Sequence, residues 1–272
     1  MIWLTVARLL SPASWLGIPF DSLVGEIDDA AAAAWTAPER QYLDGWELRW
    51  SRGSTNRTNS VRPREHVGAT SISQKLMDVR EFYARRGRPT MYQISPATQP
   101  PGLDDILDRA EYRIHNPSVV QIASVGDILG ILPPQRKGSI SQSHTLTDEW
   151  YDRWRLASES TLSTRIEDLE ILRLVQRKSV FLQLEMNHEI VAVGRGVVDG
   201  RLLGVFSMAT MASVRGRGAG REILRALAEW GRDSGAEAAY LQVDADNSPA
   251  LHLYARCGFR KLYEYWYRLS DQ

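Results

Sequence analysis

Three runs of the sequence are rich in β-branched and aromatic residues and follow one another closely. Two-residue turns at Asn187-His188 and Asp199-Gly200 separate these runs. Short turns of polar residues and glycine between apolar runs are typical of antiparallel hairpins. The pattern therefore predicts an antiparallel meander of three strands, at residues 179–186, 189–200 and 202–211.

Apolar residues spaced three and four positions apart follow the third run and predict a helix. This helix ends near Trp230, and its apolar face consists of Ile223, Leu224, Leu227 and Ala228. Residues 165–178 show a similar spacing and predict a helix before the three strands.

The remaining C-terminal residues predict a strand at 238–244, a helix at 248–257 and a final strand at 261–269. Ser248 stands at the expected N-cap of this helix, and Pro249 at its first helical position, where the N–H that proline lacks has no partner. The C-terminal half is therefore expected to be a mixed unit of helices and mainly antiparallel strands.

The N-terminal half predicts the same kinds of element. Helical patterns cover residues 21–35, 71–87 and 102–112, and strand patterns lie between them. Residues 133–145 combine a double proline, a glycine and a serine/threonine cluster, which is typical of a connector. We therefore expect four parts: an N-terminal extension (1–20), a first domain (21–133), a linker (134–144) and a second domain (145–272).

The composition narrows the class of protein. The chain has 272 residues, 33 Lys and Arg against 33 Asp and Glu, and 43% apolar residues. This balanced charge gives no electrostatic footprint for nucleic acid, and the apolar fraction is enough for packed cores. The single cysteine, Cys257, excludes a disulfide within the chain and fits a reducing, cytoplasmic setting.

The apolar start of the chain does not have the pattern of a targeting segment. No basic residue precedes its apolar run, and Arg8 interrupts that run. Residues 1–20 are therefore expected to be an extension rather than a signal peptide. No run approaches the ~18 apolar residues that a membrane span needs, so no membrane association is expected.

The segment "VRGRGAGREIL", Val214–Leu224, places three glycines and three arginines at the start of the predicted helix. Glycine destabilises a helix by roughly 1 kcal/mol relative to alanine, so three of them need a reason. The first turn of a helix has N–H groups without internal partners, and glycine lets another group approach the backbone. Backbone N–H groups and arginines together suit a pyrophosphate. The alternative is a solvated turn followed by an exposed basic helix face.

Two common phosphate motifs do not fit this loop. A P-loop needs Gly-Lys-Ser/Thr, which is absent from the sequence. A dinucleotide fold needs G-x-G-x-x-G and further parallel βα units. The third glycine would fall at Arg221, and too few residues follow Asp244 for those units.

Two motifs of the sequence resemble conserved motifs of a known family. "RGRGAG" resembles the R/Q-x-x-G-x-G/A motif by which the GNAT superfamily of N-acetyltransferases binds the pyrophosphate of acyl-CoA. The later "NSPALHLYARCGF" resembles the superfamily's N-x-x-A-x-x-L-Y-x-x-x-G-F. The matching residues are Arg215, Gly218, Gly220, Asn247, Ala250, Leu253, Tyr254, Gly258 and Phe259.

The resemblance implies a fold and a domain arrangement. The fold class would be α/β (α+β), with two GNAT-like domains, each a mixed, mostly antiparallel central sheet flanked by helices. The N-terminal half has the order of helices and strands expected of a second copy, but "RPREHVGATS" stands where the glycine loop would be. The resemblance therefore implies a tandem arrangement with a degenerate N-terminal copy and acyl-CoA binding in the C-terminal copy.

The resemblance also implies a co-substrate and its binding residues. Acetyl-CoA would be the acetyl donor, with no metal. The strand residues Met208, Ala209 and Thr210 would offer backbone N–H groups to the acetyl carbonyl and pantetheine. Asn247 and Ala250 would line the pantetheine arm. The pyrophosphate cradle would consist of Arg215, Gly216, Arg217, Gly218, Ala219, Gly220 and Arg221.

Tyr254 matches the superfamily's usual general acid. A phenol near pKa 10 is a weaker acid than a thiol near 8.5, so Tyr254 would donate a hydrogen bond first and complete proton transfer late. Packing in the core is the alternative role for this tyrosine. Glu185 and Asp244 are candidate bases, with a water chain as the alternative. Cys257 is expected to be a buried filler rather than a nucleophile.

Three functions remain open from the sequence. The first is an N-acetyltransferase acting on the primary amine of a small molecule by direct attack. The second is a protein or peptide N-acetyltransferase. The third is a non-catalytic acyl-CoA sensor or scaffold, which the intact loop and Tyr254 disfavour. The expected partner is a small amine, without nucleic acid or membrane, and the chain is expected to be a monomer or homodimer.

Overall fold

A computed structural model describes residues 16–53, 55–134, 138–158 and 164–271. Contacts between Cα atoms divide the chain into two compact units. Unit 1 gathers Met1–Ala34, Val120–Thr161 and Gln176–Leu262. Unit 2 gathers Trp35–Val119, Leu162–Val175 and Tyr263–Gln272.

The sheet of unit 1 contains the predicted meander. Strands β7 (Lys178–Met186), β8 (Glu189–Asp199) and β9 (Leu202–Thr210) pair antiparallel, which confirms the prediction from the turns. Strand β10 (Ala238–Asp244) pairs parallel with β9. Strand β6 (Ser139–Ser143) pairs antiparallel with β7 at the outer edge.

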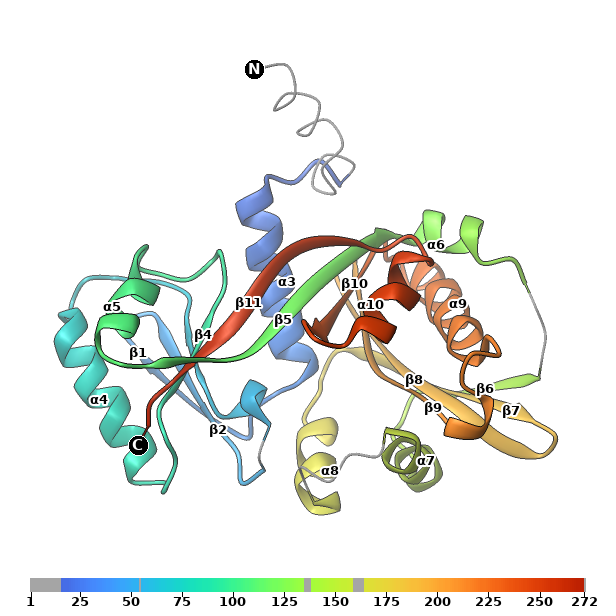
Figure 1. Cartoon of the computed structure of the whole chain (residues 1–272), viewed down its shortest axis with the longest axis horizontal. Helices are drawn as coiled ribbons and strands as arrows, with labels where there is room; N and C mark the ends of the chain where they lie inside the picture. Colours follow the sequence, from blue (N-terminus) through green and yellow to red (C-terminus); the bar gives the residue numbers. More distant parts are fainter. Residues whose placement is uncertain (1–15, 54, 135–137, 159–163, 272) are drawn as a thin grey trace. The chain divides into compact units, whose positions relative to one another are not determined.

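Helices cover both faces of this sheet. Helix α9 (Ala219–Asp233) packs on β7, β8 and β9 (Figure 1), with Ile223 and Leu227 fully buried. Helix α7 (Asp148–Ser158) packs on β7, β8 and β9, and α3 (Phe20–Ala34) packs on β9. Successive residues of a strand face opposite sides, and on β8 Arg195 donates to the carbonyl of Ala34 at the end of α3.

Two glycines of β8 let α9 approach the sheet closely. A Cβ at Gly194 would lie 2.5 Å from Ile223 Cγ2 and 2.7 Å from Met208 Sδ. A Cβ at Gly196 would lie 3.1 Å from Leu227 Cδ2. The absence of side chains at these two positions therefore sets the distance between α9 and the strand.

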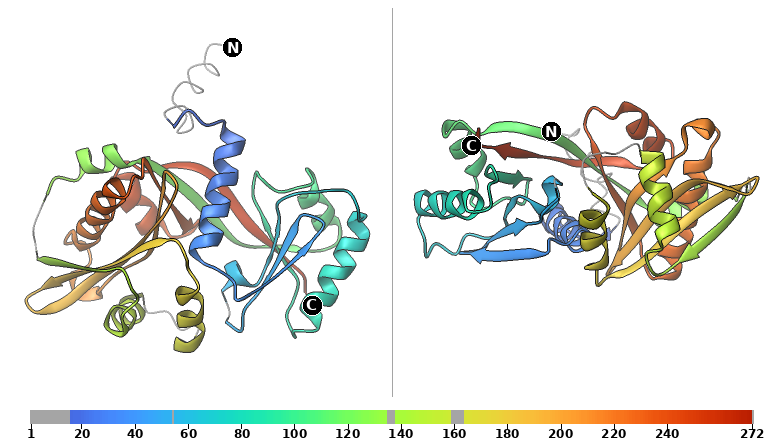
Figure 2. Two further views of the ribbon diagram at one scale, coloured as in Figure 1. Left: turned by 180° about the vertical axis from the view of Figure 1, so that it is seen from behind. Right: turned by 90° about the horizontal axis from the view of Figure 1, so that it is seen from below.

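Unit 2 contains five neighbouring strands and has its own core. Its strands follow the order β1 (Glu39–Leu43), β2 (Trp46–Trp50), β3 (Val61–Pro63), β4 (Met91–Ile94) and then β11 (Arg260–Leu269). Helix α4 (Ile72–Ala84) lies beside β1 and β2 (Figure 2). The core of unit 2 centres on aromatic residues, among them Trp46, Tyr83, Tyr92 and Tyr112.

The remaining elements are short helices. They are η1 (Asn56–Thr58), α5 (Leu103–Arg109) and α8 (Arg165–Arg173) in unit 2, and α6 (Val125–Ile131), η2 (Ala212–Val214) and α10 (Ser248–Ala255) in unit 1. No helix of the described residues is both long and apolar enough to cross a membrane.

The two halves of the chain repeat one order of elements. The series β1-β2-β3-α4-β4-α5-β5 in the first half has the same order as β7-β8-β9-α9-β10-α10-β11 in the second. In both series the strand before the longer helix pairs parallel with the strand after it. The final strands are exchanged: β11 pairs with β4 of unit 2, while the Val120–Ser124 end of β5 (Arg113–Ser124) belongs to unit 1.

The compact units therefore differ from the linear division into 21–133 and 145–272. Helix α3 and the end of β5 belong to unit 1, and helix α8 and most of β11 belong to unit 2. The segment expected to be a linker, 134–144, contains β6, so part of it is a sheet strand. Residues 135–137 of that segment, and 1–15 of the expected extension, lie outside the described residues.

Gly194→Ala is expected to destabilise the protein because its Cβ would collide with Ile223 and Met208. Overpacking of this kind costs about 1–3 kcal/mol. Gly130→Ala is the control, because a Cβ there meets nothing within 4 Å and the residue lies in helix α6. Urea unfolding of both variants tests the contact, and an unchanged midpoint for Gly194→Ala would show that α9 does not need this glycine.

Candidate active site

Strands β9 and β10 separate after a short paired stretch. Their parallel register covers only Leu202–Gly204 against Ala238–Tyr240, although β9 continues to Thr210 and β10 to Asp244. Beyond this point the β9 edge that faces β10 has no strand partner in the register, and its backbone groups can bind a ligand. The predicted residues Met208, Ala209 and Thr210 are half-buried and lie on this free part of β9.

A bulge in β9 accompanies the separation. The β8–β9 register shifts between Val193/Ala209 and Arg195/Phe206, which places one extra residue in β9. Ser207 in this bulge has a left-handed φ of 50°. Bulges bend a strand and change the direction of the following side chains, and they are frequent beside active sites. The bulge therefore lies just before the residues predicted to contact the acetyl group.

The glycine loop ends in an open helix N-terminus. Gly216 and Gly218 have φ values of 76° and 92°, a region that residues with a Cβ rarely adopt. Gly218 is the N-cap of α9 and has no side chain to cap it. Within the described part of the chain, the N–H groups of Gly216, Gly218, Ala219 and Gly220 have no protein acceptor. These donors and the positive end of the helix form a cradle that fits a phosphate anion.

Two arginines of the loop contact protein atoms rather than an open cradle. Arg215 Nε donates to the carbonyl of Thr210 at 3.1 Å, and its Nη2 to the carbonyl of Ala157 at 3.2 Å. Arg221 is hydrogen-bonded to Cys257. Arg215 therefore fixes the loop to the end of β9, and the cradle consists mainly of backbone N–H groups. Contacts of Arg215, Arg217 and Arg221 with an anion stay predictions.

Tyr254 lies in the core of unit 1. Only 7% of its surface is exposed, and its ring packs edge-on against Phe259 at 5.8 Å. Burial raises the pKa of Tyr254, and Cys257 nearby adds to the rise. A phenol with a raised pKa keeps its proton and can donate a hydrogen bond. Cys257 is fully buried, which confirms its expected place as a core residue, and burial raises the pKa of its thiol.

The start of α10 differs from the prediction by one residue. Asn247, rather than Ser248, is the N-cap, and its side-chain oxygen accepts from the N–H of Ala250 at 3.1 Å. Asparagine and serine are about equally good N-cap residues, so the residue types alone do not decide between these two neighbours. The NH₂ group of Asn247 remains as a donor toward the predicted pantetheine arm, and Ala250 packs against the core beneath it.

The two candidate bases lie at strand ends. Glu185 is exposed on β7, and its carboxylate lies 3.8 Å from Nδ1 of His188. Asp244 is exposed at the end of β10, and its carbonyl accepts from the N–H of Asn247 at 3.0 Å. Among the described residues, neither carboxylate is hydrogen-bonded to Tyr254 or to the glycine loop.

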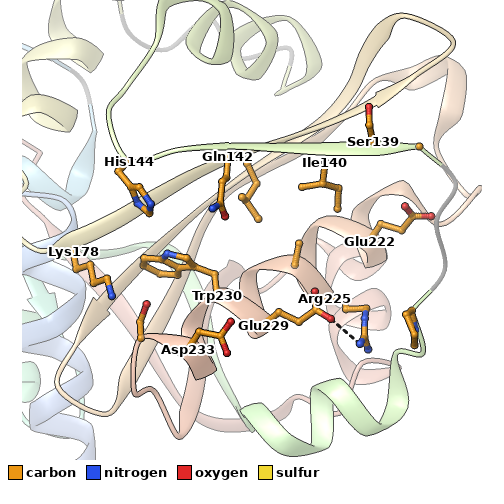
Figure 3. A pocket seen from close by; sticks show the side chains of 15 residues that line it. Ser139, Ile140, Gln142, His144, Lys178, Glu222, Arg225, Glu229, Trp230 and Asp233 are labelled. Atoms are coloured by element: carbon orange, nitrogen blue, oxygen red, sulfur yellow. Dashed lines mark ion pairs between the residues drawn. The ribbon is translucent and has the colours of Figure 1, made fainter.

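Unit 1 contains a pocket that was not predicted from the sequence. Its volume is about 930 Å³, and it lies between α9 and β6 (Figure 3). Trp230 of α9 lies near Gln142 of β6, whereas Arg225 forms an ion pair with Glu229 at 2.7 Å and donates to the carbonyl of Leu129 at 3.2 Å. None of the predicted site residues lines it. Only the pairing of β6 with the sheet creates this pocket, and the sequence had suggested a linker there.

The described residues contain no group of three or more His, Cys, Asp or Glu side chains that could hold a metal ion.

Sequence comparisons find relatives over most of the chain. A family model described as "Probable histone acetyltransferase Rv0428c C-terminal" matches residues 22–268. The "Uncharacterized N-acetyltransferase YobR" of Bacillus subtilis is 26% identical over 248 residues, which are 91% of this chain and 98% of that protein. The "Probable histone acetyltransferase Rv0428c" of Mycobacterium tuberculosis is 28% identical over 235 residues, 80% of this chain and 65% of that protein.

Solved structures show the same fold. A GCN5-related N-acetyltransferase from Kribbella flavida superposes with a TM-score of 0.68 at 15% identity, covering 92% of this chain and 96% of that one. A tandem GNAT protein from the clavulanic acid biosynthesis pathway gives a TM-score of 0.64 at 13% identity, covering 90% and 88%. These similarities support the predicted fold class, a mixed and mostly antiparallel sheet flanked by helices.

Gly218→Val is expected to weaken acetyl-CoA binding at least about tenfold, because valine strains the left-handed N-cap and obstructs the open N–H groups. Gly235→Val is the matched control: Gly235 has a φ of 89° and open space around it, at the other end of α9. Calorimetric titration measures both affinities. An unchanged affinity in a folded Gly218→Val variant would remove the loop from the binding site.

Proposed function

Since the chain belongs to the family described as probable histone acetyltransferase Rv0428c C-terminal and is an acetyltransferase of the GNAT type, we propose that it acetylates the primary amine of a small molecule by direct attack, with acetyl-CoA as donor. One observation carries the proposal. The open N-terminus of α9 lies directly after the strand that separates from β10, so a phosphate cradle and a free strand edge are adjacent in the chain.

The residues of unit 1 fit acetyl-CoA. The N–H groups of Gly216, Gly218, Ala219 and Gly220 would hold the pyrophosphate, because they have no acceptor within the described chain. The free edge of β9 at Met208–Thr210 would bind the pantetheine and the acetyl carbonyl. When bound, acetyl-CoA supplies an activated acetyl thioester and a thiol leaving group.

The backbone of β9 would stabilise the charge that develops on the acetyl oxygen. Donors fixed by a sheet need no reorientation during the reaction, and one such donor is worth about 2.7–4 kcal/mol in comparable sites. The bulge at Ser207 favours this role, because it changes the direction of the following residues, while Ala209 and Thr210 stay paired with β8 on their other edge. The arrangement requires no covalent intermediate on the protein.

Tyr254 would hold a proton near the departing sulfur. Its raised pKa keeps the phenol protonated, so it would stabilise negative charge on sulfur by hydrogen bonding and give up the proton only late. Glu185 and Asp244 stay candidate bases for the amine. Both are exposed to solvent, so a proton would pass to either of them through water.

A protein acceptor is the second candidate. It is supported by the printed name of the Mycobacterium tuberculosis relative, a probable histone acetyltransferase. The balanced net charge of the chain does not discriminate between the two acceptors, because a charged groove would mark a protein acceptor whatever the net charge.

Tyr254→Phe is expected to lower turnover by roughly 10²–10⁴-fold, the range typical of general acid–base groups, with little change in acetyl-CoA affinity. Tyr112→Phe is the control, because Tyr112 is an equally buried tyrosine in unit 2. Stopped-flow detection of the released thiol measures turnover. Full activity of Tyr254→Phe would leave this residue with a packing role alone.

The acceptor class is tested by thiol release with a panel of small primary amines and with histones and histone peptides. The proposal expects the higher kcat/KM for one or more small amines. A higher value for histone lysines would establish the protein acceptor instead. Gly218→Val should lose activity with both classes, which separates enzymatic transfer from spontaneous acetylation.

A further inference from the structure

The two units contain equivalent loops before equivalent helices. In unit 1, residues 211–218 connect β9 to α9, and in unit 2, residues 64–71 connect β3 to α4, eight residues in each case. Both loops contain a left-handed glycine, Gly216 with φ 76° and Gly68 with φ 84°. The loop of unit 2 therefore occupies the position in which unit 1 has its phosphate cradle.

The loop of unit 2 already holds an anion. The N–H groups of Ala69 and Thr70 donate to the two carboxylate oxygens of Asp44, at 3.4 and 3.3 Å. Nζ of Lys75, on the first turns of α4, lies 2.8 Å from Asp44 Oδ2. The Lys75 side chain is fully buried, and only 5% of the Asp44 side chain is exposed. Backbone N–H groups and a cation thus converge on one carboxylate, as they would on a phosphate oxygen.

A short hairpin places Asp44 in this position. Asp44 and Gly45 form the turn between β1 and β2, with φ values of 45° and 84°. The N–H of Glu65 donates to the carbonyl of Gly45 at 3.1 Å, and a Cβ at Gly45 would lie only 2.6 Å from Glu65 O. Because only glycine permits this approach, the turn and the loop are in direct contact.

The equivalent turn of unit 1 has the same length but a different chemistry. It consists of Asn187 and His188, which offer no carboxylate, and both residues are exposed. The last ladder pair before the loop is Ala192 with Thr210, so β8 extends beyond the loop before the turn begins. In the described structure, no carboxylate of this turn occupies the cradle of unit 1.

Among the residues that the structure describes, Asp44 is the carboxylate that forms an ion pair with Lys75. Its ammonium group also donates to the carbonyl of Asp44 at 2.6 Å, lies 3.1 Å from Nδ1 of His66 and lies 4.8 Å from the centre of the Trp46 ring. The hydrogen bond from Lys75 is the main cause that lowers the pKa of Asp44, so the carboxylate stays ionised. Lys75 thus depends on Asp44 for its counter-charge.

We propose that Asp44 is an internal substitute for the phosphate anion, and that it closes the degenerate copy of the acyl-CoA cradle in unit 2. Removing this carboxylate uncovers a latent site for a phosphate or pyrophosphate anion, formed by Ala69 N, Thr70 N and Lys75 Nζ. The inference rests on the proposed function only for the comparison with the loop of unit 1. The wild-type chain accordingly binds one acyl-CoA, in unit 1.

The test is anion rescue of Asp44→Gly, because glycine suits the left-handed φ of this position. Loss of the carboxylate leaves a buried ammonium group unpaired, and the melting temperature should fall by roughly 10 °C. Inorganic phosphate should restore several degrees of this loss relative to chloride at equal ionic strength. The wild type and Asp44→Gly/Lys75→Met control for the general stabilisation of proteins by phosphate; neither should show the additional gain.

Calorimetric titration with pyrophosphate gives a second readout in the Gly218→Val background, where the cradle of unit 1 is impaired. Adding Asp44→Gly should create one binding site that Lys75→Met abolishes. A folded Asp44→Gly variant without specific phosphate rescue and without this site would overturn the inference. If Asp44→Gly does not fold even in phosphate, the inference also fails, and Asp44→Asn then shows whether the turn needs only a polar side chain. Failure of the proposed function would instead appear as unchanged acetyl-CoA binding in Gly218→Val alone.

Discussion

The candidate site of unit 1 depends on how few residues of β9 and β10 pair. Parallel strands normally continue their ladder, and every unpaired backbone group near the core has to find another partner. Here three residues of each strand pair, and the strands then separate. The bulge at Ser207 bends β9. The glycines of β8 leave room for α9 on the sheet. Free strand edge and free helix N-terminus thus have a common structural cause.

The sequence predicted the parts of unit 1 that local patterns determine. The turn residues Asn187, His188 and Gly200 indicated the meander, because few residues adopt their left-handed φ values. The second turn lies one residue later than predicted, since Asp199 pairs with Leu202. The spacing around Leu227 predicted the buried face of α9. The loop between them was identified because its glycines and arginines oppose helix formation, and the structure shows an uncapped N-terminus there.

Features that depend on distant residues were not predictable in the same way. Helix α7 was not predicted, because Asp148–Ser158 is rich in polar residues and directly follows the segment assigned to a connector, although Trp150, Tyr151 and Ala157 are buried. Arg215 was assigned to an anion, although its position also lets it bond the carbonyls of Thr210 and Ala157. The contact of Asp44 with Thr70 joins residues 26 positions apart, and no local pattern indicates it. The exchanged strands also join residues far apart in the sequence, such as Leu269 with Met91, so no local pattern indicates them.

The exchange of β5 and β11 has a consequence for synthesis on the ribosome. Unit 2 is built mainly from Trp35–Val119, yet its sheet also needs Trp266–Leu269, which pair with β4. These residues are translated after every other strand of both units. The nascent first half must therefore keep the edge of β4 unpaired until the second half has emerged, and the two units complete their sheets together rather than in the order of translation.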